Sequence, residues 1–172
     1  MKIFICEICG DAYIGGEKPA DCPFCGAKGN FIKLGSEANP IVSQENRISE
    51  SSRKNLKETL QLEIKANAIY LCMAGKAKSY EIKAMYKRLA KIEFEHANIV
   101  CKLMKIKMPE IIARSCSENE IENFKKTIEL EDHAVELYKK FTAETDEKNI
   151  KIFFTALAQA EEGHGELIKN YL

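Results

Sequence analysis

The chain has 172 residues with 26 basic and 26 acidic side chains, so its formal net charge at neutral pH is zero. This length suits one well-formed core with a small added module and excludes a large multidomain enzyme. The balanced charge and the lack of a Lys/Arg block argue against nucleic acid or an anionic membrane as a partner. The sequence contains no apolar run of about eighteen residues and no secretory signal at Met1, so we expect a cytoplasmic protein.

The composition changes between Ser36 and Pro40. Glycine and proline are frequent before this point, and long segments with helical periodicity follow it. We therefore expect two domains, a small module at residues 1–36 and a helical domain at residues 37–172. The module is too short to bury a self-sufficient apolar core, so another interaction must hold it together.

Four cysteines of the module form two Cys-x-x-Cys pairs, Cys6 with Cys9 and Cys22 with Cys25, and a glycine follows each pair. The two-residue spacer lets both sulfurs of a pair reach one ion, and glycine permits the tight turn behind them. Two such pairs predict a tetrahedral site of four thiolates, which suits zinc or a single iron. The three scattered cysteines, Cys72, Cys101 and Cys116, are interpreted as reduced, small hydrophobic residues.

The rest of the chain predicts four helices, because apolar residues recur there at helical spacing. Ser117 followed by Glu120 has the form of a capping box at the start of the third helix. Two short connections and one longer middle connection favour a four-helix bundle. The expected helices lie near residues 45–76, 80–105, 118–144 and 148–171.

A pattern of carboxylates and histidines occurs twice in these helices, with an offset of 68 residues. Each copy has a glutamate 30 residues before a Glu-x-x-His sequence, so the two glutamates stand at equal depth across a helical hairpin. Two facing hairpins would bring four carboxylates and two imidazoles together, which without a cation would be costly to bury. The pattern predicts a dinuclear metal site, suited to iron or manganese. Its predicted ligands are Glu63, Glu93, His96, Glu131, Glu161 and His164.

Tyr70 and Tyr138 follow Glu63 and Glu131 by two helical turns and share their inward face. A buried hydroxyl needs a partner, so we expect these tyrosines to form hydrogen bonds with metal-bound carboxylates. His133 has no counterpart in the first copy and is expected to be exposed.

With these motifs the chain resembles the rubrerythrins, in which a rubredoxin-like module is joined to a ferritin-like bundle with a di-iron site. The aromatic residues around the cysteines, such as Tyr13 and Phe24, resemble those of rubredoxin. The module comes first, as in the reverse rubrerythrins. The resemblance implies a mainly α fold, one iron (or zinc) on the four cysteines and two irons in the bundle. Glu93 and Glu161 would bridge the two irons.

The resemblance also implies an NADH-linked peroxidase of oxidative-stress defence that reduces hydrogen peroxide to water. An upstream reductase would supply electrons through the cysteine site, and the protein would be a homodimer. Glu63, Glu131, Tyr70 and Tyr138 would be the catalytic residues. Ala134 stands where typical rubrerythrins carry an additional glutamate, which leaves a di-iron oxidase or ferroxidase using O2 or Fe(II) as an alternative. A non-catalytic iron- or zinc-binding protein is a further alternative.

Overall fold

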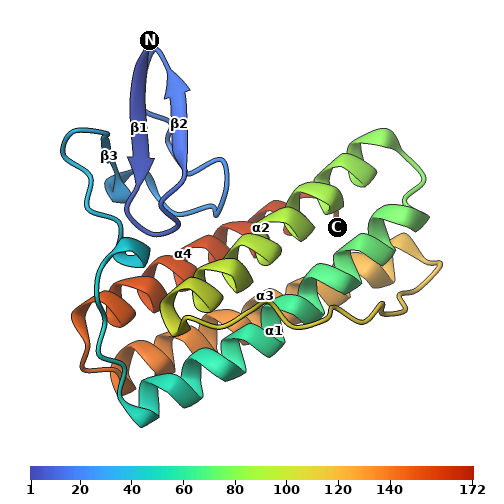
Figure 1. Ribbon diagram of the computed structural model, residues 1–172. Helices are drawn as coiled ribbons and strands as arrows, with labels where there is room; N and C mark the ends of the chain where they lie inside the picture. Colours follow the sequence, from blue (N-terminus) through green and yellow to red (C-terminus); the bar gives the residue numbers. More distant parts are fainter.

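The computed structural model describes all 172 residues. The chain begins with a three-stranded antiparallel sheet in the order β2-β1-β3, formed by β1 (Lys2–Cys6), β2 (Ala12–Gly15) and β3 (Ile32–Leu34). A short 3-10 helix, η1 (Gly29–Phe31), precedes β3, and a second one, η2 (Ile41–Ser43), follows it. Figure 1 shows this sheet standing on one side of a bundle of long helices. The expected domain boundary at residues 36 and 37 falls between β3 and η2 and stays a prediction.

The four helices form two antiparallel hairpins, α1 (Glu50–Lys76) with α2 (Tyr80–Met104) and α3 (Glu120–Glu144) with α4 (Lys148–Lys169). Three residues separate the helices within each hairpin, whereas a long connection without regular structure joins α2 to α3. The structure confirms a ferritin-like bundle with a small cysteine module. The first helix begins five residues later than the sequence pattern indicates, at Glu50.

Side-chain caps define where three of the helices begin. Ser49 and Ser79 each accept a hydrogen bond from the backbone three residues on, at the starts of α1 and α2. The expected capping box at α3 is wrong. Asn119 caps this helix through its Oδ1, which accepts from two backbone N–H groups, whereas the Ser117 hydroxyl donates to Glu122. Glu120 instead accepts a hydrogen bond from the backbone of Lys78 in the other hairpin.

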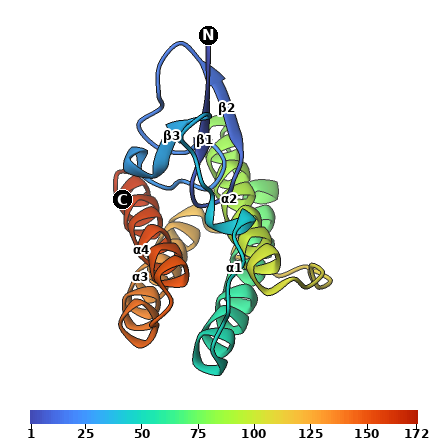
Figure 2. The same ribbon diagram turned by 60° about the vertical axis from the view of Figure 1, so that its left-hand side comes forward.

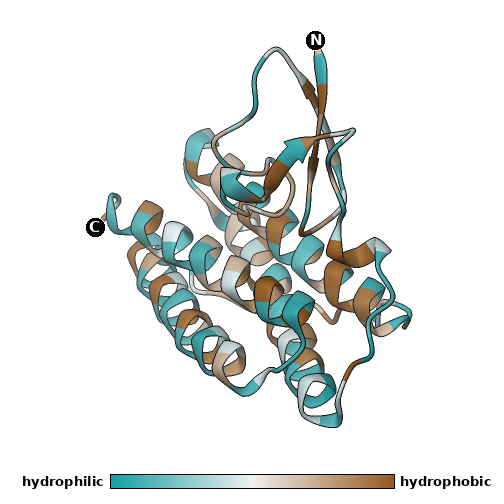
Figure 3. Cartoon of the chain, turned by 90° about the vertical axis from the view of Figure 1, so that its left-hand side faces the viewer, coloured by the Kyte–Doolittle hydropathy of each residue, from teal (hydrophilic) through white to brown (hydrophobic).

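The apolar core is divided into two clusters by the middle of the bundle. The larger cluster joins the module to the end of the bundle where α2 and α3 end and α1 and α4 begin, and it includes Phe4, Ile8 and Val100. The smaller cluster fills the opposite end around Tyr86 and Phe124. Figure 3 shows apolar and polar segments alternating along each helix, as expected for helices with one buried face. The predicted ligands of the bundle lie between the two clusters.

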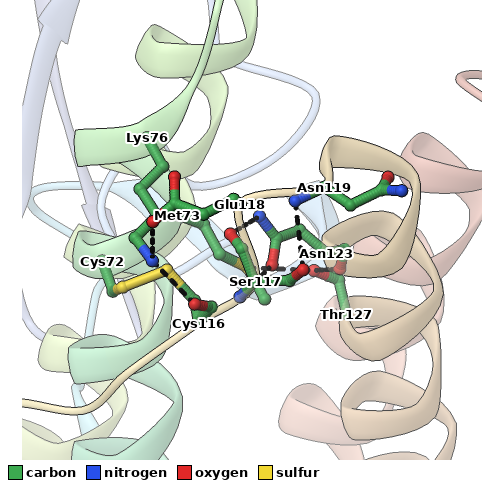
Figure 4. The surroundings of a disulfide bond; sticks show 9 residues. All are labelled: Cys72, Met73, Lys76, Cys116, Ser117, Glu118, Asn119, Asn123 and Thr127. Carbon is green, nitrogen blue, oxygen red and sulfur yellow. Dashed lines mark hydrogen bonds and ion pairs between the residues drawn. A yellow bond between two sulfur atoms is a disulfide. The ribbon is translucent and has the colours of Figure 1, made fainter.

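A disulfide joins Cys72 of α1 to Cys116 in the α2–α3 connection. The interpretation of these two residues as reduced thiols is therefore wrong, whereas Cys101 is a free, buried thiol as expected. Next to the disulfide, Lys76 donates to the carbonyl of Cys116 and pairs with Glu118 (Figure 4). The end of the long connection is thus fixed to the first hairpin just before α3 begins.

The module contacts both hairpins. Figure 2 shows it above α2 and α4, with α1 and α3 on the far side of the bundle. From α2, Lys102 donates to the carbonyl of Cys9 at 3.2 Å, and from α4, Ala160 lies against Gly26. The module therefore covers the side of the bundle that carries both Glu-x-x-His sequences. None of the helices is long and apolar enough to span a membrane.

Candidate metal centres

The structure brings the four cysteines of the module together. Cys6 ends β1, and the tight turns behind Cys9 and Cys25 are closed by Gly10 and Gly26, which have φ values of 83° and 73°. All four sulfurs lie within 4.8 Å of one another, and the side chains are at most 3% exposed. This left-handed backbone favours glycine, so the residue after each pair is part of the site's geometry.

Four buried sulfurs at these distances fit a single cation. Hydrogen bonds with Cys22, together with burial, raise the pKa of the Cys9 and Cys25 thiols. The four groups therefore cannot all ionise without a positive charge between them. A tetrahedral thiolate set without oxygen or nitrogen ligands fits one iron of the rubredoxin type.

The six predicted ligands of the bundle also converge. They form two overlapping groups, each with its potential ligand atoms within 4.8 Å of one another. Glu93 and Glu161 belong to both groups, as expected of bridging carboxylates. The first group adds Glu63 and His96, and the second adds Glu131 and His164.

Both imidazoles present Nδ1 to the carboxylates. His96 Nδ1 lies 3.1 Å from Glu161 and 3.2 Å from Glu93, and His164 Nδ1 lies 2.7 Å from Glu161 and 3.4 Å from Glu93. Although these contacts are short, neither nitrogen has a partner with hydrogen-bond geometry. The same holds for buried oxygens of Glu63, Glu93 and Glu161. Buried polar atoms normally have partners, so this common set of unpaired atoms fits two metal ions.

The electrostatics of the cluster support the same conclusion. Burial raises the pKa of Glu63 and Glu131 well above the ordinary value. Burial lowers the pKa of His96 and His164, but the nearby carboxylates, Glu161 foremost, outweigh it and raise both values. The four carboxylates carry more negative charge than two imidazolium ions can balance. Two irons would supply the missing charge and accept these donor atoms.

The two tyrosines bind the glutamates of the opposite hairpin. The Tyr70 hydroxyl of α1 donates to Glu131 of α3 at 2.6 Å, and the Tyr138 hydroxyl of α3 donates to Glu63 of α1. Both tyrosines are fully buried. Their expected hydrogen bonds with carboxylates are confirmed, and each bond links one copy of the repeated pattern to the other. Burial, together with the neighbouring carboxylates, raises the pKa of both hydroxyls, so they keep their protons.

A hydrogen bond that the sequence does not predict joins the two metal centres. His96 Nε2 lies 2.8 Å from the carbonyl oxygen of Cys25. Because Nδ1 faces the carboxylates, Nε2 carries the proton and donates to this carbonyl. No local pattern could indicate this contact, since it depends on how the module packs on α2. His133 is exposed, as expected, and Ala134 is buried next to Glu131.

Comparisons with known proteins agree with this architecture. The family model named Rubrerythrin matches residues 54–172. Reverse rubrerythrin-1 of Clostridium acetobutylicum is 32% identical over 113 residues, which cover 60% of this chain and 62% of the relative. The chain thus matches less than two thirds of that relative's length.

A solved structure shows the same fold. The hypothetical protein Pfu-1136390-001 from Pyrococcus furiosus superimposes with a TM-score of 0.61 at 23% identity, over 70% of this chain and 87% of that one. The family match covers the helices that carry all six bundle ligands. The chain belongs to the rubrerythrin family and is similar within it to a reverse rubrerythrin.

Proposed function

We propose that the protein is a peroxidase that reduces hydrogen peroxide to water in the bundle, with electrons relayed through the cysteine module. The observation that carries this proposal is the hydrogen bond between His96 Nε2 and the Cys25 carbonyl. It supplies a short covalent and hydrogen-bonded route from a cysteine of one centre to an imidazole of the other.

The irons supply the redox chemistry when bound, and hydrogen peroxide takes up two electrons and two protons to give two waters. The side chains around them hold the geometry. Tyr70 and Tyr138 fix the orientation of Glu131 and Glu63 through their hydroxyls. These hydroxyls also hold protons next to the cluster, which supports a role in proton delivery.

Burial of the cluster supports chemistry that excludes bulk water. The glutamates at the centre are at most 3% exposed, and His164 is 8% exposed on the side of the module. A small molecule such as hydrogen peroxide or O2 fits such a site, whereas a large substrate does not.

We also propose that an upstream reductase, linked to NADH, reduces the cysteine iron. We further propose that the protein is a homodimer in the cytoplasm.

One residue favours a second candidate function. Ala134 is 2% exposed and follows Glu131 by three residues on α3. A methyl group there cannot act as an additional metal ligand, so the carboxylate set is the same in both hairpins. This symmetry favours an oxidase or ferroxidase that uses O2 or Fe(II).

An anaerobic single-turnover experiment separates the two functions. The iron-loaded protein is reduced, and one equivalent of hydrogen peroxide or of O2 is added while the ferric-thiolate absorption is followed. A peroxidase shows fast return of the colour with hydrogen peroxide and slow return with O2. Glu63→Ala abolishes the fast phase, whereas Glu58→Ala, an exposed glutamate on the same helix, leaves it unchanged.

If the ferric-thiolate absorption returns faster with O2 than with hydrogen peroxide, the protein is an oxidase rather than a peroxidase. No return with either oxidant, with iron bound at both centres, would leave a non-catalytic iron-binding protein.

A further inference from the structure

A strip of basic residues runs along the exposed face of α2. Lys83, Lys87 and Lys91 recur every four residues, and Arg88 lies next to them on the same side of the helix. Together with Tyr80 and Ala84 they line a shallow groove of about 450 Å³. We call Lys83, Lys87, Arg88 and Lys91 the α2 basic strip.

The α2 basic strip has no counter-charge. None of its four cations lies within ion-pair distance of a carboxylate, although seven other lysines of the chain form such pairs. The two exposed or half-buried glutamates of α2 are engaged elsewhere. Glu81 accepts a hydrogen bond from Tyr171 at 2.8 Å, and Glu95 pairs with Lys102 at 3.2 Å. The strip is therefore a local excess of positive charge on a chain with no net charge.

The strip contacts the cysteine module through Arg88. Arg88 Nη2 reaches the carbonyl oxygen of Phe24 at 3.4 Å, and Phe24 lies between the two cysteines of the second pair. Phe24 is 37% exposed, whereas the next residue, Cys25, is 1% exposed. Residues 1–36 contain four lysines and four acidic residues, so the side chains outside the cysteine site give the module no excess of positive charge. A molecule that docks near the module by electrostatic attraction would be positioned by α2.

We propose that the α2 basic strip is the docking surface for a small electron-donor protein with an acidic face, which passes one electron to the cysteine iron past Phe24. This rests on the proposed relay function of that site. In each encounter the donor loses one electron and the ferric iron becomes ferrous. A nicotinamide cofactor delivers a hydride, which is two electrons, so it does not match a single iron that accepts one.

Electron-transfer partners of this kind recognise each other through complementary charges. Transient electron-transfer complexes bury little surface and form fast because opposite charges attract at long range. Unpaired lysines give this attraction without a fixed geometry, since their ammonium groups are flexible point charges. The exposed Tyr80 lies three residues before Lys83, and the partly exposed Phe24 contacts Arg88 through its carbonyl; both provide apolar contact area.

Binding is tested on the zinc-loaded protein, which folds around its metals but carries out no redox reaction. An oxidised flavodoxin and an acidic rubredoxin are titrated into isotope-labelled protein at low and high ionic strength. We expect backbone amide shifts from Tyr80 to Lys91 and around Phe24. The variant Lys83→Glu/Lys87→Glu/Lys91→Glu should bind at least about tenfold more weakly at low ionic strength, and the difference should shrink at high ionic strength.

The matched control reverses three unpaired lysines on the far side of the bundle, Lys54→Glu/Lys57→Glu/Lys65→Glu on α1, with the same change of net charge. It should bind both probes as the unmodified protein does. Equal weakening in both triple variants, or equal binding in the strip variant and the unmodified protein, would overturn the proposal. Amide shifts in the strip on addition of NADH alone would also overturn the proposal, because they indicate a phosphate-binding site. Loss of self-association by the strip variant in sedimentation would overturn it as well, because it indicates that the strip binds a second copy of the chain.

Stopped-flow reduction of the iron-loaded protein provides the second readout. Reduced flavodoxin should reduce the cysteine iron of the strip variant at least about tenfold more slowly, whereas the small cation radical of methyl viologen should reduce it no more slowly than in the unmodified protein. Neither readout depends on hydrogen peroxide. Charge-dependent binding without peroxide turnover would therefore refute the proposed peroxidase and leave the docking surface intact.

Discussion

Removal of the Cys72–Cys116 disulfide should lower the stability of the bundle substantially. The perturbation is Cys72→Ser/Cys116→Ser, which replaces both sulfurs by hydroxyls of similar shape and breaks the covalent link between α1 and the α2–α3 connection. The contacts of Lys76 with Cys116 and Glu118 use a backbone carbonyl and a neighbouring carboxylate, so the substitution leaves them in place. The loss should therefore come mainly from the unfolded chain, which gains freedom.

The magnitude follows from the length of the loop that the disulfide closes. The two cysteines are 44 residues apart in sequence. In the chain-entropy description, a closed loop of this length lowers the entropy of the unfolded state by an amount worth about 4 kcal/mol at room temperature. For a domain of this size each kcal/mol changes the melting temperature by roughly 2 to 4 °C, so the double variant should melt roughly 10 °C lower.

The assay is thermal unfolding followed by far-ultraviolet circular dichroism, with zinc in both centres so that the reductant changes no metal. A phosphine reductant should lower the melting temperature of the unmodified protein to that of the double variant and have no effect on the variant itself. Melting of the double variant within about 1 °C of the unmodified protein would refute the loop-closure reasoning. Equal sensitivity of both proteins to the reductant would refute it as well.

Three further predictions concern the metal centres and the bundle. Tyr138→Phe leaves Glu63 without its hydrogen-bond donor and should speed the release of metal to a chelator by about tenfold, whereas the exposed Tyr80→Phe should not change it. Removal of all metal by chelation should lower the melting temperature, because four buried cysteines and six buried bundle ligands lose their cations, and an unchanged value would contradict the metal sites. Although burial opposes it, hydrogen bonds from the start of α1 lower the pKa of Glu147 to about 2. This folded-state pKa lies below the ordinary 4.5, so the ionised carboxylate stabilises the fold, and Glu147→Gln should lower the unfolding free energy by about 1 kcal/mol above pH 4.5. When the unfolding free energy of both proteins is measured against pH, this difference should decrease as the pH falls toward 2.

The metal centres were predictable because their residues follow fixed spacings. A pair such as Cys6 and Cys9 reaches one ion in any chain that turns behind it, and Glu-x-x-His presents both side chains on one face of any helix. The duplicated pattern also predicted how far along the bundle each glutamate lies, since residues at equal distances from a turn stand at equal positions along a hairpin. Local geometry was therefore sufficient for the ligand positions and for the four helices.

The features that the sequence did not predict all depend on contacts between distant segments. Cys72 and Cys116 have no spacing that marks them as partners, and they meet only because the connection returns along α1. Ser117 and Asn119 are both good caps two residues apart, and Glu120, which the capping box would use, instead accepts a hydrogen bond from Lys78 of the other hairpin. The docking of the module on α2 likewise follows from packing.

The docked module makes the two halves of the bundle unequal. His96 and His164 are equivalent in the duplicated pattern, but only His96 donates its Nε2 proton to the module, whereas His164 Nε2 faces Gly26 without a hydrogen bond. A ring that donates its second N–H to a carbonyl is a more basic ligand through its other nitrogen. The two irons should therefore differ in electron density and give two distinct Mössbauer doublets, although their carboxylate surroundings match. The two copies of the hairpin are therefore not equivalent, because the module contacts both of them but accepts a histidine hydrogen bond from only one.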